Sequence, residues 1–377
     1  MNGQRVYLDW NATAPLRPEA RAAMLEAMDV VGNPSSVHAE GRAAKAIVEK
    51  ARGQVAALVG CDPDEVVFTS GATEAAAILM YGDDEQAAAE IEHACILDHI
   101  NDSDPRRVVK WRDHIAVDEG GIVTVSEAAR SELGSGHEAV LCLQAANSET
   151  GIMQSLARSN AEGLRIICDA AQICGKSEMG SVPNASEHVL LSGHKFGANK
   201  GIGALVTRRP IDLEVLLKGG GQEKGRRSGT ENVVGIAGFG AAAEAAQRHL
   251  EDGVWEPVEK LRNILEDTLA EAAPETIFFG QESPRLPNTS CFAVPGWRGE
   301  TQVMQMDLAG FAVSAGSACS SGKVNKASRV LLAMGFDEIT ASSAIRVSMG
   351  PTTTEAEVMA FADAWKDAYR RRKARAA

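Results

Sequence analysis

The chain has 377 residues, of which 45% are hydrophobic and 24% are charged, with 38 lysines and arginines against 51 aspartates and glutamates. This length and composition predict a globular protein of two or three domains and exclude a disordered chain. The acidic excess argues against a nucleic-acid-binding surface, because phosphate backbones require clustered positive charge.

The first ten residues, MNGQRVYLDW, contain no apolar segment of the kind that directs export. No later stretch approaches the ~18 uninterrupted apolar residues of a membrane span. We therefore expect a cytoplasmic protein that neither crosses nor binds a membrane.

Helix and strand patterns then alternate along the chain. Apolar residues at helical spacing predict helices over 18–30 and 41–59. The β-branched run Val66–Thr69 predicts a strand, and a helix at Ala72–Leu79 follows it. Further strands are predicted at Arg107–Trp111, Ala139–Leu143, Leu164–Cys168, His188–Leu191 and Ile202–Thr207. Several of these are continuous apolar runs, typical of parallel strands covered on both faces, so the pattern predicts an α/β fold with ligands bound beyond the carboxyl ends of the strands.

Two long helical stretches, 231–252 and 256–272, end this pattern, and the domain boundary is expected near residue 255. A second, smaller α/β set follows. Its strands are predicted at Thr289–Val294, Ala312–Ser314 and Ala344–Ser348, and its helices near 300–309, near 327–334 and from Thr354 onward. The one basic run, Arg370 to Arg375, is interpreted as a solvated helix end rather than a binding tail.

The seven cysteines are odd in number, widely spread and without a C-x-x-C pair: Cys61, Cys95, Cys142, Cys168, Cys174, Cys291 and Cys319. This excludes a disulfide framework or a zinc ribbon and indicates a reducing compartment. Cysteines inside strand-like runs are interpreted as packing residues. Cys319 differs, because small residues from Ser314 to Gly322 surround it, and we expect an exposed thiol that has a function.

Three further motifs follow predicted strands. The turn Ser70-Gly71 precedes a helix whose first N–H groups suit a phosphate, although such a turn is also common as a plain cap. Asp169 ends an apolar strand, where a carboxylate either caps the next helix or pairs with the protonated ring nitrogen of a cofactor. Lys195 belongs to no Walker loop. It is either simply exposed or a partly desolvated amine of the kind that bonds covalently to a carbonyl cofactor.

Taken in order, these motifs resemble those of the pyridoxal-phosphate-dependent cysteine desulfurases, the NifS/IscS-like group of the class V aminotransferase superfamily. The resemblance runs through YLD and NAT near the N-terminus, SGATEA, EH, NSETG, DAAQ, SGHK, RRSGTEN, SAGSACSSGK and AIRVS. It implies a fold-type I transferase and a homodimer. The large domain, 15–255, would hold a mostly parallel seven-stranded sheet, and residues 1–14 and 256–377 would form a smaller α/β domain that carries the Cys319 loop.

The resemblance also implies a role for each residue of the predicted site. Lys195 would bind pyridoxal 5'-phosphate and move protons, with His93 stacked on the ring. The remaining cofactor contacts would come from Ala72, Thr73, Ser148, Asp169, Gln172, Ser192 and His194, and from Thr230 of the neighbouring subunit. Arg346 would hold the carboxylate of the substrate, for which a guanidinium fork is suited, with Asn147 and Asn11 also at the substrate.

The implied reaction converts L-cysteine into L-alanine and leaves the sulfur on Cys319 as a persulfide, because a thiolate is the attacking nucleophile. The sulfur would pass to an acceptor or iron–sulfur scaffold protein, for iron–sulfur cluster assembly and related pathways. No resident metal is expected, although Cys319 is a candidate transient iron–sulfur ligand.

Two residues depart from the family pattern. Ser148 stands where asparagine is usual, and its shorter hydroxyl is expected to reach the phenolic oxygen of the cofactor through water. Trp10 stands where a smaller or polar residue is usual. Selenocysteine lyase and class V aminotransferase remain alternative activities, since neither needs Cys319, and a non-enzymatic scaffold is a third alternative.

Overall fold

The computed structural model describes residues 5–81, 85–102, 115–135, 139–159, 161–208, 215–316 and 327–376. The predicted strand at Arg107–Trp111 and the predicted nucleophile Cys319 lie outside these ranges.

A six-stranded sheet forms the centre of the larger part, in the order β2-β9-β8-β7-β6-β3. Its strands are β2 (Val66–Thr69), β9 (Gly203–Thr207), β8 (His188–Ser192), β7 (Ile166–Asp169), β6 (Ala139–Cys142) and β3 (Glu85–Ala88). All run parallel except β9, which pairs antiparallel with both of its neighbours. The α/β fold with a mostly parallel sheet is therefore confirmed, with six strands in the described residues where seven were predicted.

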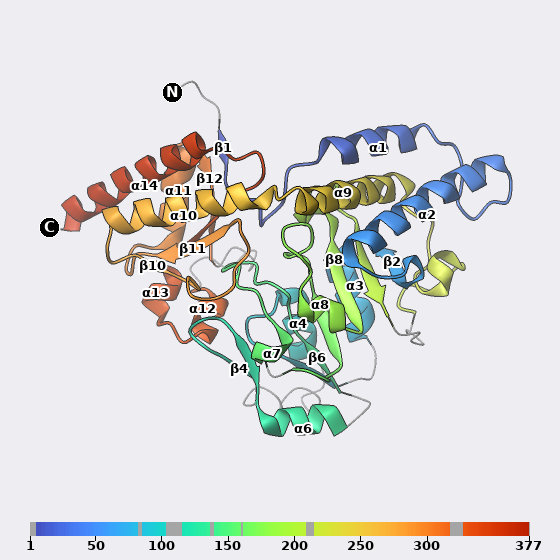
Figure 1. Ribbon diagram of the computed structural model, residues 1–377, viewed down its shortest axis with the longest axis horizontal. Coiled ribbons are helices and arrows are strands. Elements are labelled where there is room, and N and C mark those ends of the chain that lie inside the picture. The colour runs from blue at the N-terminus through green and yellow to red at the C-terminus, as the bar shows by residue number, and fades with distance from the viewer. Residues whose placement is uncertain are drawn as a thin grey trace.

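Every residue of β2, β8 and β9 is buried, because helices cover both faces of the sheet. Alternate side chains enter two different hydrophobic clusters. Val189 and Leu191 pack into one cluster, whereas Leu190 packs into the other with α3 (Ala72–Met80) and α4 (Ala94–Asp102). Three long helices lie together at the top of Figure 1: α1 (Pro18–Met28), α2 (Ala39–Val59) and α9 (Val233–Glu251).

A second sheet, on the left of Figure 1, has the order β10-β11-β14-β13 and is antiparallel throughout. Its strands are β10 (Ile277–Phe278), β11 (Thr289–Ala293), β14 (Ala344–Ser348) and β13 (Ser314–Ala315). The helices packed beside it are α10 (Trp255–Ala272), α11 (Gly299–Leu308) and α14 (Glu355–Ala376). The N-terminal strand β1 (Val6–Tyr7) pairs with β12 (Phe311–Ala312), and Leu8 enters the same core as residues from 255 onward. This core supports the predicted division of the chain into 15–255 and the remainder, which stays a prediction.

The remaining short elements connect these layers. They are β4 (Ile115–Val117), β5 (Val123–Val125), α6 (Glu127–Ser135), α7 (Leu156–Ser159), α8 (Ser181–Ala185), α12 (Arg329–Ala333) and α13 (Glu338–Ser342), with short 3-10 turns at Pro63–Glu65, Gly193–Lys195 and Gln222–Gly225. The predicted helices are confirmed to within a few residues, whereas β3, the β4–β5 hairpin and β10 were not predicted. The sequence of β3, EQAA, contains no β-branched or aromatic residue, so it carries no strand signal.

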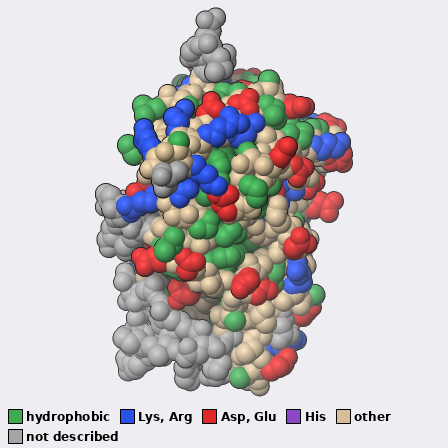
Figure 2. Space-filling model, turned by 90° about the vertical axis from the view of Figure 1, so that its left-hand side faces the viewer, with side chains coloured by type: hydrophobic (Ala, Val, Ile, Leu, Met, Phe, Trp, Pro, Cys, Tyr) green, Lys and Arg blue, Asp and Glu red, His purple; other side chains and the backbone are tan. Residues whose placement is uncertain are grey.

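The basic run lies at the end of α14. Arg370 pairs with Asp367 at 3.0 Å, and Lys373 pairs with Glu275 at 3.0 Å. Figure 2 faces this end of the molecule and shows basic and acidic side chains beside one another. The run therefore agrees with the interpretation as a solvated helix end. In the part of the chain that the structure describes, no helix is long and apolar enough to cross a bilayer.

Candidate active site

A cavity of about 590 Å³ opens where β2, β7 and β8 end and the second sheet approaches them. Most of the predicted site residues line it: Asn11, Ala72, Thr73, His93, Ser148, Asp169, Gln172, Ser192, His194, Lys195 and Arg346. Cys95, Gln144, Lys200 and Ser314 also line it, although the sequence did not single them out. Residues from eight separate segments of the chain therefore converge where a parallel sheet is expected to bind ligands.

Lys195 follows β8 in a single 3-10 turn, which directs its amine into the cavity. Its Nζ donates to the backbone carbonyl of Asn11 at 2.8 Å and to that of Ala12 at 3.0 Å. The amine is therefore held by two neutral acceptors from the N-terminal segment and remains at the cavity wall.

His194 lies beside three lysines. Burial lowers the pKa of its imidazole to about 4, and the charges of Lys195 and Lys200 add to this effect. Its Nδ1 is buried and has no hydrogen-bond partner among the described residues. A neutral ring with a free nitrogen, surrounded by amines, is suited to an anionic ligand such as a phosphate.

The turn between β2 and α3 lines the same end of the cavity. The first N–H groups of a helix have no intrahelical acceptor, and Ala72 and Thr73 occupy these positions in α3. The turn packs so closely on β9 that a Cβ added at Gly203 would lie 2.6 Å from Gly71 Cα and 2.4 Å from the carbonyl oxygen of Leu191. Glycine at 203 therefore allows the turn, which is suited to bind an anion, to lie against β9.

Asp169 and His93 lie on other walls of the cavity. Asp169 ends β7, and its Oδ1 accepts from the Ala171 N–H at 2.9 Å, so one carboxylate oxygen is fixed by the following turn. His93 Nδ1 accepts from the Cys95 N–H at 3.1 Å. Because Nδ1 accepts a hydrogen bond, the ring proton of a neutral His93 would lie on Nε2.

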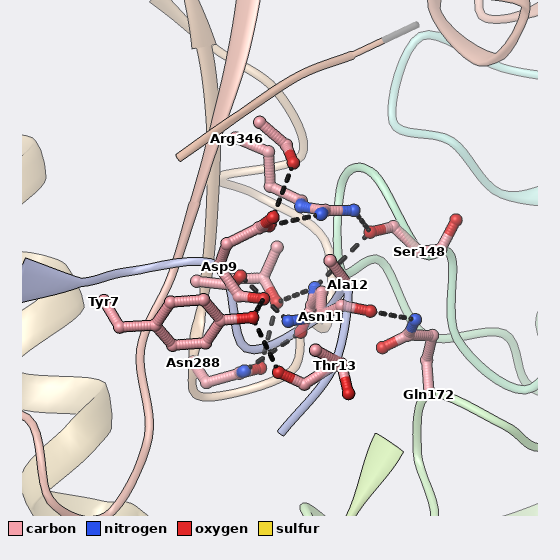
Figure 3. Close-up of polar contacts among 12 residues, drawn as sticks. Tyr7, Asp9, Asn11, Ala12, Thr13, Ser148, Gln172, Asn288 and Arg346 are labelled. Carbon is pink, nitrogen blue, oxygen red and sulfur yellow. Dashed lines mark hydrogen bonds and ion pairs between the residues drawn. The ribbon is translucent and has the colours of Figure 1, made fainter. Parts of the chain in front are cut away.

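Arg346, at the centre of β14, closes the cavity from the second sheet, and Figure 3 shows its contacts. Its Nη2 donates to Asp9 Oδ1 at 2.6 Å, and its Nη1 donates to the carbonyl of Ser148 at 2.8 Å. Ser314 donates to the other oxygen of Asp9 at 2.8 Å. Two of the five guanidinium N–H groups are used in these contacts, and the buried Nε of Arg346 has no partner within the described ranges, so donors remain for a ligand.

Glu149 is buried close to Gly316 and Ser328. Its Oε2 accepts from Ser328 at 2.6 Å, and a Cβ added at Gly316 would lie 3.2 Å from the same oxygen. Burial raises the pKa of Glu149 to about 7, despite the opposing hydrogen bond from Ser328 and the nearby charge of Arg346. This carboxyl thus binds Ser328 and leaves little room for a side chain at position 316.

Three predicted residues are placed away from the cavity or outside the described structure. Asn147 lies behind the wall, where its Oδ1 accepts from the N–H groups of Glu149 and Thr150 and its Nδ2 donates to the Ile91 carbonyl. Its amide therefore holds the turn together and does not line the cavity, and its contact with a substrate stays a prediction. Thr230 is exposed and does not line the cavity of its own chain. Cys319 lies outside the described residues.

The structure explains the unusual tryptophan at position 10. Trp10 does not line the cavity; it packs on Gly350, where a Cβ would lie 2.1 Å from the indole. The large side chain thus depends on glycine at 350.

Lys176, which the sequence analysis missed, is buried beneath the cavity wall, four residues after Gln172 and directly after Gly175. The available signal was its position in the turn that follows Asp169, within the mostly apolar segment Ile173-Cys174-Gly175.

Comparison with known proteins agrees with this geometry. The sequence profile of the Aminotransferase class-V family matches residues 6–361. A cysteine desulfurase of Cereibacter sphaeroides is 38% identical over 371 residues, which cover 94% of this chain and 93% of the relative. A cysteine desulfurase of Klebsiella pneumoniae is 37% identical, with 94% of this chain and 90% of the relative covered.

The fold is also similar to those of solved structures. A NifS-like protein from Rickettsia africae superimposes with a TM-score of 0.85 at 29% identity, covering 97% of this chain and all of that one (100%). The structure of SspA in complex with cysteine superimposes with a TM-score of 0.73 at 25% identity, covering 93% of this chain and 100% of that chain.

Proposed function

Since the chain belongs to the class-V aminotransferase family and, within it, to the cysteine desulfurases, we propose that it converts L-cysteine into L-alanine and transfers the sulfur to Cys319. The observation that carries this proposal is the convergence on one cavity of the Lys195 amine, the Asp169 carboxylate, the first turn of α3 and the Arg346 guanidinium.

These residues fit pyridoxal 5'-phosphate as the cofactor. The donor set on one side, made of the α3 turn, Ser192 and the free Nδ1 of neutral His194, suits a phosphate. Asp169 would pair with the ring nitrogen, Gln172 would contact the phenolic oxygen, and Lys195 would hold the aldehyde carbon. When bound, the cofactor supplies an electron sink for negative charge that develops on the substrate.

Three residues of the chain would bind the substrate, transfer a proton and hold the cofactor ring. Arg346, fixed in its plane by Asp9 and Ser148, binds the carboxylate of L-cysteine. Lys195, whose Nζ donates to the backbone carbonyls of Asn11 and Ala12 at the cavity wall, would accept and return a proton at that nitrogen. His93 would limit the movement of the bound ring by stacking on one face.

The transfer of sulfur to Cys319 needs no external oxidant, because every electron pair comes from the enzyme thiolate or the substrate. The Cys319 thiolate supplies the electron pair of the new S–S bond to the sulfur of the substrate. The Cβ–S bond of the substrate breaks, its electron pair stays on carbon, and that carbon takes up a proton to give alanine. The enzyme is left with a persulfide on Cys319.

Partners and location are part of the same proposal. Thr230 is exposed near Arg227, which is tied to Glu74 of α3 by a 2.9 Å ion pair, and this supports a homodimer in which Thr230 reaches the cavity of the neighbouring subunit. The persulfide would be delivered to a sulfur-acceptor or iron–sulfur scaffold protein. The six cysteines within the described ranges are free thiols, which supports a cytoplasmic location.

The test begins with the colour of the protein reconstituted with pyridoxal 5'-phosphate. We expect a visible absorption band that disappears on reduction with borohydride, with the label on Lys195 by peptide mapping. Lys200, which also lines the cavity, is the internal comparison and should stay unlabelled. A protein that binds no cofactor, or one labelled at Lys200 alone, would overturn the proposal.

A further inference from the structure

Lys176 is the one fully buried lysine among the described residues, with 1% of its surface exposed. It lies in the turn that follows Asp169, at the bottom of the cavity wall. Its Nζ donates to Gln172 Oε1 at 2.8 Å and to Asn11 Oδ1 at 3.0 Å. In the part of the chain that the structure describes, no carboxylate pairs with it.

The surroundings of Lys176 favour the neutral amine. Burial lowers the pKa of Lys176 well below its ordinary value, and the charges of Lys195 and Arg346 lower it further. A neutral amine has two N–H groups, and two acceptors lie within hydrogen-bonding distance. Lys176 therefore acts at this position as a paired donor rather than as a counter-ion.

The two acceptors of Lys176 are the oxygen ends of two side-chain amides, which fixes how both amides are oriented. With its oxygen bound to Lys176, Gln172 must direct its NH2 group the other way, where Nε2 donates to the Asn11 carbonyl at 3.1 Å, as Figure 3 shows. That NH2 group has a second hydrogen, and Gln172 lines the cavity.

Asn11 is oriented in the same way. Its Oδ1 accepts from Lys176 and Asn288, and its Nδ2 donates to Thr289 at 2.9 Å. The backbone carbonyl of Asn11 then accepts from Lys195 at 2.8 Å. Lys176 thus binds Gln172 directly and is linked to Lys195 through Asn11, and both Gln172 and Lys195 line the cavity.

We propose that Lys176 is a positioning residue that locks the Gln172 amide with its NH2 group toward the cavity, so that Gln172 can only donate to the anionic oxygen of a bound aromatic ligand. This inference rests on the proposed function, because the ligand that supplies the oxygen is pyridoxal 5'-phosphate. Without Lys176, the amide is free to turn and present its own oxygen, which would repel that of the ligand.

The test is a double-mutant cycle on the reconstituted full-length protein. The variants are Lys176→Met, which keeps the length of the side chain without a donor, Gln172→Ala and the double variant. Two quantities are measured: the dissociation constant of pyridoxal 5'-phosphate and the position of the visible absorption maximum. Hydrogen bonds of this kind change affinity by about tenfold, so each single variant should bind the cofactor about tenfold more weakly and shift the maximum. The double variant should show no further change, because both act through one amide.

Additive effects in the double variant, or a Lys176→Met protein with the wild-type maximum, would overturn the inference. If Lys176→Met does not fold, Lys176→Gln keeps an N–H donor and should retain the wild-type maximum; a shifted maximum in that folded variant, equal to that of Gln172→Ala, would count against the inference. A wild-type chain that binds no pyridoxal 5'-phosphate at all would overturn the proposed function itself, so the two failures are distinguishable.

Discussion

Asp9 and Arg346, 337 residues apart in the chain, form an ion pair of 2.6 Å, which fixes a guanidinium that lines the cavity. The contact joins the N-terminal segment to the central strand of the second sheet, and Ser314 donates to the same carboxylate. Because Ser148 also accepts from Arg346, the guanidinium plane is fixed before any ligand arrives. Such preorganisation lowers the entropic cost of binding a carboxylate.

Replacing Arg346 by lysine removes the planar fork but keeps a positive charge. We expect the KM for L-cysteine to rise about 100-fold, since a charge-assisted pair of hydrogen bonds is replaced by a single point contact. The visible absorption band should remain that of the wild type, because the proposed role of Arg346 is to bind the substrate rather than the cofactor. Steady-state alanine formation measures the effect, and an unchanged KM would contradict the assigned role.

Gly203→Ala tests the close packing of the anion-binding turn. The added Cβ would meet two backbone atoms, at 2.4 and 2.6 Å, and backbone yields less easily than a side chain. We expect a loss of about 3 kcal/mol in the free energy of unfolding and weaker binding of pyridoxal 5'-phosphate.

Gly53→Ala is the matched control for this variant. It lies inside α2, nothing is within 4 Å of its added Cβ, and alanine there should stabilise the protein by about 0.5–1 kcal/mol. Equal destabilisation by both variants would show that the close approach at Gly203 is not the cause.

Glu223 has an unusual backbone conformation, with φ 49°, and its side chain is buried. Its carboxylate accepts from Arg52 at 2.8 and 2.9 Å and from the Phe68 N–H at 2.9 Å, which anchors the segment leading to Thr230. Glu223→Ala should cost about 3–5 kcal/mol of unfolding free energy, because it leaves Arg52 buried without its partner.

Glu49→Ala provides the comparison on the same arginine. Glu49 also pairs with Arg52, at 3.2 Å, but its side chain is 48% exposed. Its removal should cost only a few tenths of a kcal/mol. The measurement is denaturant unfolding of both variants. Similar losses of unfolding free energy in Glu223→Ala and Glu49→Ala would contradict the account.

Glu149 predicts a pH dependence of stability. Burial raises its pKa from the ordinary 4.5 to about 7, so the folded state binds the proton more tightly than the unfolded state. The free energy of unfolding should therefore fall as the pH rises from about 4.5 to 7, by about 3 kcal/mol from this group. Above pH ~7 the loss is complete.

Glu149→Gln keeps an acceptor for Ser328 and cannot ionise, so this part of the pH dependence should disappear. The measurement is denaturant unfolding at pH ~5 and ~8 for both proteins, with Glu271→Gln on the exposed face of α10 as the control. A wild-type protein and a Glu149→Gln variant with parallel pH profiles would contradict the burial effect.

The sequence predicted much of the sheet and the cavity because both depend on local patterns. Continuous apolar runs indicate strands that are buried on both faces, and residues that end such strands, such as Asp169 and Lys195, meet at one edge of a parallel sheet. The resemblance supplied the residues of the second sheet, including Arg346, which no local pattern connects to the cavity.

The features that the sequence did not predict depend on contacts between residues far apart in the chain. The strand β3 exists because β6 pairs with it, and its own residues do not favour a strand. Asn147 carries the same amide as Asn11, yet its turn directs that amide away from the cavity. The apolar residues before Lys176 hint that it is buried, but only the fold shows that it binds Asn11 and Gln172.

The central claim is that Cys319 receives the sulfur of L-cysteine, and the release of alanine by the reconstituted protein tests it most directly. Cys319→Ser should keep the visible band of the cofactor while alanine formation falls by about 100-fold or more, because the nucleophile is lost. Cys61→Ser is the control, since burial raises the pKa of the Cys61 thiol to about 12 and makes it a poor nucleophile; this variant should release alanine at the wild-type rate. Full alanine release by Cys319→Ser would contradict the account.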